Sequence, residues 1–455
     1  MKSKQGISRR NFLQMGASLG MVASLGSFKL ANATQAADYK ALVCVFMFGG
    51  NDGHNVVVPW PKLSDGVTPN PEYTTYSNGR GALALAQNKL LPINAGTKSY
   101  GLNYGLPELQ SLYQQGRMAV LANVGMIVQP TSRQQYLAQS VPLPSQLFSH
   151  SDQIIQVQTG APNTSTGTGW GGRTVDLMAS NNAGTNFPVA ISLNGSALFN
   201  TTQTAKSASF QPGNYLDQNA MSMYPASAGT ARMIAQQEIN ALNSGLPMIT
   251  AANQVMTDAV QLNPLLKGTA GGQNILSPFP NTSIGNQLKE VAHLISLRSQ
   301  LAIGRQVFFV GLGGFDTHSS EAYDQWALLV QVSQAMSAFY NATLELGIAN
   351  QVTTFTLSEF GRTLQPNNSG SDHGWGSHHL VVGGAVNGGN VYGTFPSLIL
   401  GGNDDANNRG VLIPTTSLSQ YGATLARWFG ATDSQLNAVF PTLVNFPLRD
   451  LGFMA

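Results

Sequence analysis

The sequence predicts an α/β fold with a mainly parallel central sheet covered by helices on both faces. Short continuous apolar runs, such as 41–48 and 118–124, have the composition of strands that are buried on both faces. They alternate with segments such as 286–301, in which apolar residues recur at helical spacing. This alternation is typical of parallel sheets with a helix in each crossover.

The same two patterns place the other elements along the chain. Further strands are expected at 307–312, 352–357 and 380–386, and helices at 107–115, 326–340 and 417–429. Between 129 and 280 the pattern is weak, and Pro and Gly are scattered through sequence with few charges. This stretch is expected to form an insertion or cap over the sheet.

The first 33 residues are interpreted as a twin-arginine secretion signal. The motif SRRNFL at 8–13 lies between a basic start and a mildly apolar run, and the small residues at 31–33 suit cleavage. The alternative is a membrane anchor, but glycine and serine dilute the run, and no later segment reaches the roughly 20 apolar residues that cross a bilayer. We therefore expect a periplasmic or extracellular protein that meets the twin-arginine export machinery, with one domain over 34–455 and no integral membrane segment.

Charge and cysteine content exclude several classes of protein. Five of the 23 Lys and Arg lie in the signal and none of the 21 acids does, so cleavage after residue 33 leaves a net charge of −3. A slightly acidic chain without a basic run offers no electrostatic surface for nucleic acid. Cys44 is the only cysteine, so no internal disulfide can form. A chain of this length can bury a sufficient core without one.

Three predicted strands are each followed by a glycine-rich or polar turn that carries an acid. These acids are Asp52, Asp316 and Glu359. Ligands of open α/β sheets bind beyond the carboxyl ends of the strands, so the three carboxylates are expected at one edge of the sheet. The sequence does not give the strand order that would bring them together.

Histidines are concentrated in the same part of the chain. Of seven in total, four lie between 313 and 380: His318, His373, His378 and His379. Each follows an acid or another histidine closely, and imidazoles with carboxylates are the ligands of zinc, manganese or iron, whereas oxygen-rich sets suit calcium or magnesium. The sequence predicts one or two divalent metal ions. The alternative is that these are packing residues, and His54 and His150 are intermediate cases.

Four motifs resemble a large family of bacterial exported proteins, domain-of-unknown-function family 1501, which is related to the sulfatase and alkaline phosphatase superfamily. The motifs are FMFGGNDGHNVVVP at 46–59, GFDTH at 314–318, SEFGRT at 358–363 and SDHGWG at 371–376. The resemblance covers most of the mature chain at both ends and is weak in the middle.

This resemblance implies an alkaline-phosphatase-like fold with two metal ions that stabilise the attacking and leaving oxygens of an in-line displacement. It assigns Asp52, Asp372 and His373 to one ion, and Asp316, His318 and either His378 or His379 to the other. Ser149, in LFSHS at 147–151, takes the position of the nucleophile. The alternative for Ser149 is an ordinary helix cap.

The chain also departs from the superfamily pattern. One residue separates Asp316 from His318 where three are usual, so a loop rather than a helix face must present them. Glu359 ends the predicted strand and is an alternative to Asp372, with Arg362 close enough in sequence to bind an anion. Cys44 is in the wrong place for the formylglycine of sulfatases, which favours phosphate over sulfate.

The leading hypothesis is an exported metal-dependent hydrolase of phosphate esters, with sulfate esters less favoured and Ser149 and Arg362 as catalytic residues. Its substrate would be a small anionic ester or a polysaccharide. The alternative is a non-catalytic metal-binding or polysaccharide-binding assembly protein on the same scaffold. No Gly-x-Gly-x-x-Gly motif opens a helix after a strand, which disfavours a dinucleotide-dependent redox enzyme.

Overall fold

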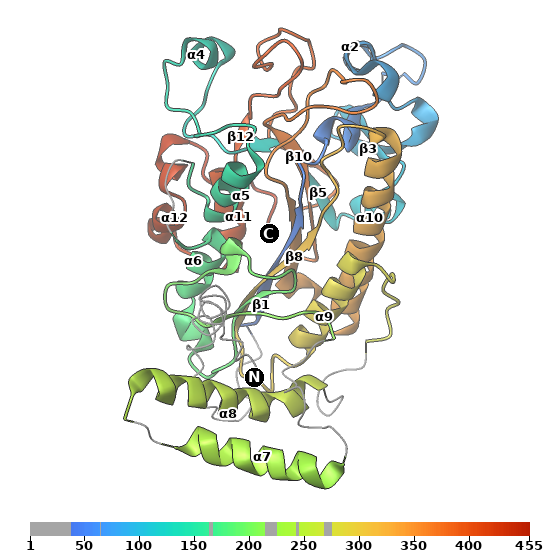
Figure 1. Cartoon of the computed structure of the whole chain (residues 1–455). Helices are drawn as coiled ribbons and strands as arrows, with labels where there is room; N and C mark the ends of the chain where they lie inside the picture. The colour runs from blue at the N-terminus through green and yellow to red at the C-terminus, as the bar shows by residue number, and fades with distance from the viewer. Residues whose placement is uncertain (1–37, 64, 163–166, 214–224, 243–244, 268–274) are drawn as a thin grey trace, which may run out of the picture.

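A mostly parallel sheet runs through the middle of the computed structural model (Figure 1). The structure describes residues 38–455 except 64, 163–166, 214–224, 243–244 and 268–274. The predicted secretion signal, 1–33, lies outside the described residues. In the described part of the chain, no helix is both long and apolar enough to span a membrane.

The strands follow the order β11-β5-β10-β9-β1-β8-β6-β7, and β12 pairs with β5. Their bounds are β1 Lys40–Met47, β5 Met118–Gly125, β6 Ala190–Ser192, β7 Ser207–Ser209, β8 Arg305–Leu312, β9 Val352–Leu357, β10 Ser377–Gly383, β11 Val391–Tyr392 and β12 Thr416–Ser417. Among the pairings described for this sheet, only those of β10 with its neighbours β5 and β9 are antiparallel. The prediction of a mainly parallel α/β sheet is therefore confirmed.

The central strand β1 determines where the site can form. It pairs with β8 from Lys40↔Arg305 to Met47↔Leu312, and on its other side with β9 from Ala41↔Val352 to Phe46↔Leu357. Residues 41–46 have no exposed surface, as expected for an apolar strand with helices above and below it. Because these parallel strands are in register, the turns that follow them meet at one edge of the sheet.

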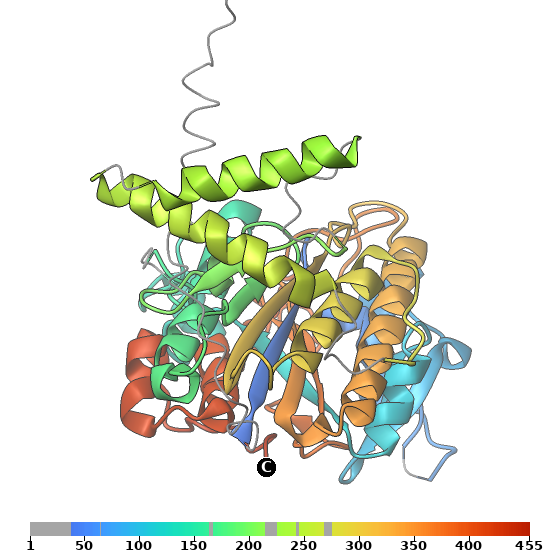
Figure 2. The same ribbon diagram turned by 90° about the horizontal axis from the view of Figure 1, so that it is seen from below.

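Helices cover both faces of the sheet (Figures 1 and 2). One face carries α3 Pro107–Gln114, α9 Ser283–Ser296 and α10 Glu321–Glu345, and the other carries α5 His150–Thr159, α6 Trp170–Asp176, α11 Leu418–Phe429 and α12 Asp433–Val439. Ser417 and Gln420 form a capping box that fixes the start of α11. A smaller sheet, β2-β4-β3 (Val57–Pro59, Lys98–Asn103 and Leu90–Ala95), lies beside α2 Pro71–Arg80.

Part of the segment expected to form an insertion, 129–280, belongs to the main sheet. Strand β6 pairs with β8, and β7 continues the sheet beyond it. The segment also contains α4 Arg133–Ala138, α5 and α6. Helices α7 Ala226–Ala241 and α8 Pro247–Lys267 lie outside the layers, beyond the end of the sheet at which β1 begins (Figure 1).

Candidate metal centre

Three imidazoles and a carboxylate converge at the edge of the sheet where β1, β8 and β9 end. Asp316 and His318 follow β8, His150 is the first residue of α5, and His373 lies in the loop before β10. The ligand atoms of His150, Asp316 and His373 all lie within 4.8 Å of one another. The Nε2 atom of His373 is 3.1 Å from Nε2 of His150 and 3.1 Å from Nε2 of His318.

Hydrogen-bond acceptors hold the outward nitrogens of two of these rings, those of His373 and His150. Nδ1 of His373 donates to the carbonyl oxygen of Phe148 at 2.7 Å, and Nδ1 of His150 lies 2.8 Å from Oε1 of Glu359. Nδ1 of His318 is 3.6 Å from Oδ1 of Asp372. With the proton on Nδ1, a neutral ring presents a lone pair at Nε2. An outer acceptor behind each imidazole is the usual arrangement around metal ions.

The spacing of the Nε2 atoms fits a shared cation. Two lone pairs cannot hydrogen-bond to each other, so this separation requires either a proton on one Nε2 atom or a cation between the rings. Nitrogens bound to zinc at 2.0–2.1 Å in tetrahedral geometry lie about 3.3 Å apart, close to the observed separation. The residues present therefore fit a metal ion.

Asp316 supplies the negative charge of the group. Its Oδ1 lies 3.0 Å from Nε2 of His318 and 3.3 Å from Nε2 of His373, and its Oδ2 lies 3.5 Å from Nε2 of His150. Burial alone would raise the pKa of Asp316, but the hydrogen bond and charge of Arg362, with the nearby His318 and His150, lower it. Asp316 is therefore ionised and able to bind a cation at neutral pH.

Arg362 holds Asp316 from the inside of the molecule. Its guanidinium donates to Oδ1 of Asp316 at 2.8 Å and also to the carbonyl oxygens of Ser371 and Gly49. The side chain has no exposed surface. Its donors are directed at protein atoms, so this geometry suits the orientation of Asp316 better than direct contact with an anionic substrate.

Glu359 joins the turn after β1 to the histidine group. Its side chain is 1% exposed, and Oε1 accepts from the backbone N–H of Gly49 at 2.8 Å as well as from His150. Gly49 has a φ of +121°, and a Cβ atom there would lie 2.2 Å from the backbone nitrogen of Asp316. Glycine is therefore required where these two loops touch.

The pKa values of His150 and His373 are shifted in opposite directions. The hydrogen bond to Glu359 raises the pKa of His150 above its usual value. Burial lowers the pKa of His373, although the Phe148 carbonyl acts in the opposite direction. A proton arriving at this group would therefore occupy His150 before His373.

The structure does not bring Asp52 to this group. Its carboxylate is buried against Arg80, which also contacts Glu321 at 2.5 Å, and Oδ1 accepts from the backbone N–H of His54 at 3.1 Å. Asp52 caps the short turn at Gly53–Asn55. The acid that follows β1 is thus buried, with Arg80 as its charged partner, and does not contact the histidine group.

Asp372 lies behind His318 rather than among the Nε2 atoms. Its oxygens accept from Asn367 and, at 2.6 Å, from Arg409. These two hydrogen bonds lower the pKa of Asp372 although burial opposes them. Asp372 and His373 are adjacent in sequence, but their side chains have different partners.

His378 and His379 lie in the core, apart from the histidine group. Nδ1 of His378 accepts from the backbone N–H of Asn123 at 3.0 Å, and His379 stacks on Tyr421 with ring centroids 5.9 Å apart. Burial lowers both pKa values to about 3. The reason is that β10 begins at Ser377, three residues before the predicted strand, so both histidines are strand residues. Asp316, His318 and His373 thus share one cluster instead of being divided between two.

Ser149 lies beside the cluster, at the N-cap of α5. Its hydroxyl donates to Oδ2 of Asp152 at 2.6 Å and makes no capping hydrogen bond to the helix backbone. Phe148, just before it, has a φ of +74°, which is unusual for a bulky residue. This turn directs the Phe148 carbonyl to His373 and brings His150 into the group.

His150 is the member that the sequence did not single out. It is far from the other ligands along the chain, and Asp152, two residues after it, is the acid closest to it in sequence. The available signal was its position beside Ser149, to which the resemblance assigns the role of nucleophile. That signal did not distinguish His150 from a surface histidine.

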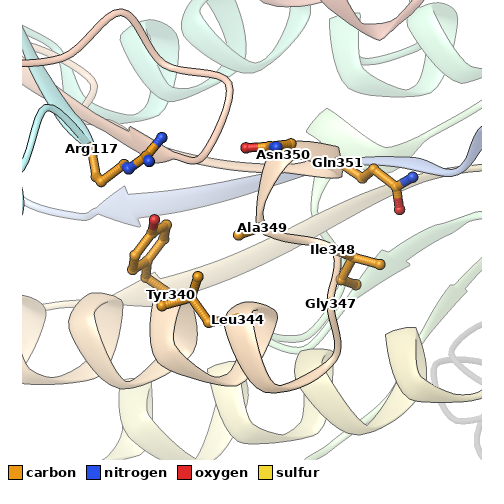
Figure 3. Close-up of a pocket in the computed structure, with 8 residues that line it drawn as sticks. All are labelled: Arg117, Tyr340, Leu344, Gly347, Ile348, Ala349, Asn350 and Gln351. Atoms are coloured by element: carbon orange, nitrogen blue, oxygen red, sulfur yellow. The ribbon is translucent and has the colours of Figure 1, made fainter.

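A separate hollow of about 380 Å³ lies near the starts of β5 and β9 (Figure 3). It is lined by Arg117, Tyr340, Leu344 and residues 347–351. None of these eight residues is a histidine or an acid, so this hollow has no ligand set for a metal.

Fold and site together define an α/β protein with a histidine and carboxylate cluster at the carboxyl edge of a mostly parallel sheet. Residues 39–411 match the model of a family described as "Protein of unknown function (DUF1501)". The chain belongs to this family.

Several solved structures are similar to this chain at low TM-scores. Ps i-CgsB has 9% identity and a TM-score of 0.35, with 88% of this chain and 74% of that chain covered. The PsFucS1 sulfatase from Pseudoalteromonas sp. has 13% identity and a TM-score of 0.33, with 91% and 72% covered. The lipoteichoic acid synthase LtaP from Listeria monocytogenes has 7% identity and a TM-score of 0.31, with 92% and 81% covered. No curated protein matches by sequence.

Proposed function

We propose that this protein is a metal-dependent hydrolase of phosphate esters, with sulfate esters less favoured. The observation that carries the proposal is the convergence of three Nε2 atoms on Asp316, with 3.1 Å between neighbouring nitrogens. A mainly nitrogen donor set favours zinc, manganese or iron over calcium or magnesium. When bound, such an ion stabilises negative charge that develops on the transferring group.

In this proposal His150, Asp316, His318 and His373 hold the ion, while Glu359 and Arg362 orient two of these ligands. Ser149 is the nucleophile. Its hydroxyl already donates to Asp152 at 2.6 Å, so a carboxylate is in place to take its proton as the oxygen attacks phosphorus. The bond to the ester oxygen breaks, that oxygen leaves as the alcohol with the proton from Asp152, and water then hydrolyses the phosphoserine to release phosphate. The start of α5 offers free backbone N–H groups and the positive end of a helix dipole to an anionic group.

The test compares Ser149→Ala with Ser140→Ala, which removes an exposed hydroxyl nine residues earlier in the chain. Both variants would be assayed on phosphate monoesters, phosphate diesters and sulfate esters after metal content has been measured. We expect Ser149→Ala to lose at least about 100-fold in kcat with unchanged metal content, and Ser140→Ala to stay near the parent rate. Bound metal with no hydrolysis of any ester by the parent would favour the non-catalytic binding protein instead. No metal after reconstitution would overturn the hydrolase and favour a polysaccharide-binding protein.

We also propose export through the twin-arginine pathway. The support is the SRRNFL motif with its basic flank and small residues at 31–33. An Arg9→Lys/Arg10→Lys variant should remain in the cytoplasm in a fractionation experiment, whereas Lys2→Gln should still be exported. Equal export of the double variant and the parent would contradict this proposal.

A further inference from the structure

Arg409 lies beside the metal centre and reaches solvent. Its Nη1 atom donates to Oδ2 of Asp372 at 2.6 Å, and Oδ1 of Asp372 lies 3.6 Å from Nδ1 of His318. The carboxylate of Asp372 therefore stands between the guanidinium of Arg409 and the ring of a proposed ligand. The side chain of Arg409 is 39% exposed, whereas that of Arg362 has no exposed surface.

The hydrogen bonds of Arg409 differ from those of Arg362. All three guanidinium nitrogens of Arg362 donate to protein atoms, which belong to Gly49, Asp316 and Ser371. Within the part of the chain that the structure describes, Nε and Nη2 of Arg409 donate to no protein atom. These two N–H groups point the same way along one edge of the guanidinium plane. Such an edge matches two oxygens of a phosphate, sulfate or carboxylate group.

The loop that carries Arg409 is held by hydrogen bonds on both sides. Three backbone N–H groups within 401–411 donate to the carboxylate of Asp405, which is 1% exposed. On the other side, the carbonyl oxygen of Arg409 accepts from the N–H of Gln365 at 2.9 Å. A fixed backbone leaves only the side chain to be ordered when a ligand binds, which lowers the entropic cost of binding.

Arg133 on α4 holds the same loop from outside. Its Nε donates to the carbonyl oxygen of Asp405 at 2.7 Å, and its Nη2 donates to Oδ1 of Asn408, the residue before Arg409. Helix α4 lies at the end of the molecule at which β1 ends (Figure 1). Arg133 is therefore a positioning residue for the loop that presents Arg409.

The two acids of this loop are engaged elsewhere. The carboxylate of Asp405 is buried inside the loop, and Oδ2 of Asp404 accepts from the backbone N–H of Ser397 at 2.7 Å. Among the described residues, Asp372 is the one carboxylate that forms an ion pair with Arg409, and it does so through Nη1. The free edge of Arg409 is thus open to an anion from solution.

We propose that this edge of Arg409 binds a second anionic group of the substrate. The inference rests on the proposed hydrolase function, because it names the substrate class of that site. An imidazole and a carboxylate stand between the free edge and the Nε2 atoms of the cluster, so the two anionic groups must be several bonds apart. The substrate is then a phosphate ester whose alcohol carries another phosphate, sulfate or carboxylate group, not a small ester with one anionic group.

The test measures the binding of two probes, fructose 1,6-bisphosphate and fructose 6-phosphate, to the metal-loaded mature chain by calorimetry. A Ser149→Ala background prevents hydrolysis during the measurement. We expect the bisphosphate to bind at least about 10-fold more tightly, because only its second phosphate reaches the charged donors of Arg409. Equal affinities for the two probes would overturn the proposal.

Two variants of Arg409 separate anion binding from support of Asp372. Arg409→Lys keeps a cation for Asp372 but lacks the planar edge, so metal content should stay at the parent value while the preference for the bisphosphate falls about 10-fold. Arg409→Gln should lose the same preference. The control is Arg117→Gln, an exposed arginine that donates to the carbonyl oxygen of Gly384 at 2.9 Å, and it should keep the preference.

Two results would reject the role of Arg409. One is an unchanged preference in both variants, and the other is a loss of preference that accompanies loss of metal in both, since Arg409 would then act only through Asp372. Failure of the hydrolase proposal looks different. A chain that prefers the bisphosphate through Arg409 but whose Ser149-containing form hydrolyses no ester would contradict the hydrolase and retain the second anion site.

Discussion

Nδ1 of His373 donates to the carbonyl oxygen of Phe148 at 2.7 Å across 225 residues of chain. A carbonyl oxygen only accepts, so this contact places the ring proton on Nδ1 and leaves the lone pair on Nε2, where His150 and His318 also point. The contact joins the turn before α5 to the loop before β10. It therefore fixes both the tautomer of one ligand and the position of the segment that carries another.

Removing a ligand of the proposed centre should remove the metal. We expect His150→Ala and His373→Ala to lower the bound metal at least about 10-fold after dialysis, as measured by elemental analysis. The control is His379→Phe, which replaces a buried ring stacked on Tyr421 with another ring and should keep its metal. Metal lost from the control but retained in His373→Ala would contradict the single cluster.

Glu359→Gln should weaken metal binding without unfolding the protein. The amide oxygen can still accept from the Gly49 N–H, but it is a weaker acceptor for His150 than a carboxylate. Changes of this kind outside the ligands typically cost about 10–100-fold in metal affinity, which competition titration would measure. Glu72→Gln, in an exposed pair with Lys98, should leave the affinity unchanged.

Arg80→Met should destabilise the fold strongly. Arg80 is fully buried between Asp52 and Glu321, and its loss leaves two buried carboxyl groups without their cation. Breaking a buried pair from one side costs about 3–5 kcal/mol, which urea denaturation would detect. Lys98→Met breaks an exposed pair and should cost less than about 1 kcal/mol. Similar costs for both variants would mean that the buried cluster is not a structural support.

Acid should destabilise the protein below pH 6.5 through its buried histidines. His54, His378 and His379 have pKa values lowered from 6.5 to about 3 by burial, so between these values only the unfolded chain takes up their protons. Their contribution is complete above pH 6.5 and is lost as the pH falls, by up to about 1.4 kcal/mol per pH unit for each histidine.

The variant His379→Phe tests this acid dependence. It should reduce the slope of unfolding free energy against pH by the equivalent of one proton, measured by denaturant titration between neutral pH and pH 5. Tyr421→Phe keeps the stacked ring and His379, so its slope should equal that of the parent. An unchanged slope in His379→Phe would mean that the imidazole is protonated in the folded state.

The sequence predicted the sheet well because its central strands are continuous apolar runs. The predicted strand 352–357 has the same bounds as β9, and 41–48 differs from β1 by one residue at each end. Prediction failed where polar residues begin a buried strand, as at Ser377 and the two histidines after it. It also could not find the strand pairing of β6 or the helices α7 and α8, whose patterns are weak.

The sequence predicted the residue types of the site, but it did not predict which of these residues lie together. Asp316, His318 and His373 were singled out by type and neighbours, and the structure places them in contact. Asp52 follows β1 and Asp316 follows β8, yet the side chain of Asp52 points inward to Arg80. The direction of a side chain at a strand end depends on tertiary partners such as Arg80, which no local pattern reveals.

The proposed ligands come from separate parts of the chain, so the chain must fold before it can bind the ion tightly. Only Asp316 and His318 are close neighbours in sequence, while His150 arrives with α5 and His373 with the loop before β10. A growing chain would therefore present one weak pair of donors until the last strands dock. Tight uptake of an ion would then report that assembly is finished, and afterwards the ion would hold distant loops together and slow their opening.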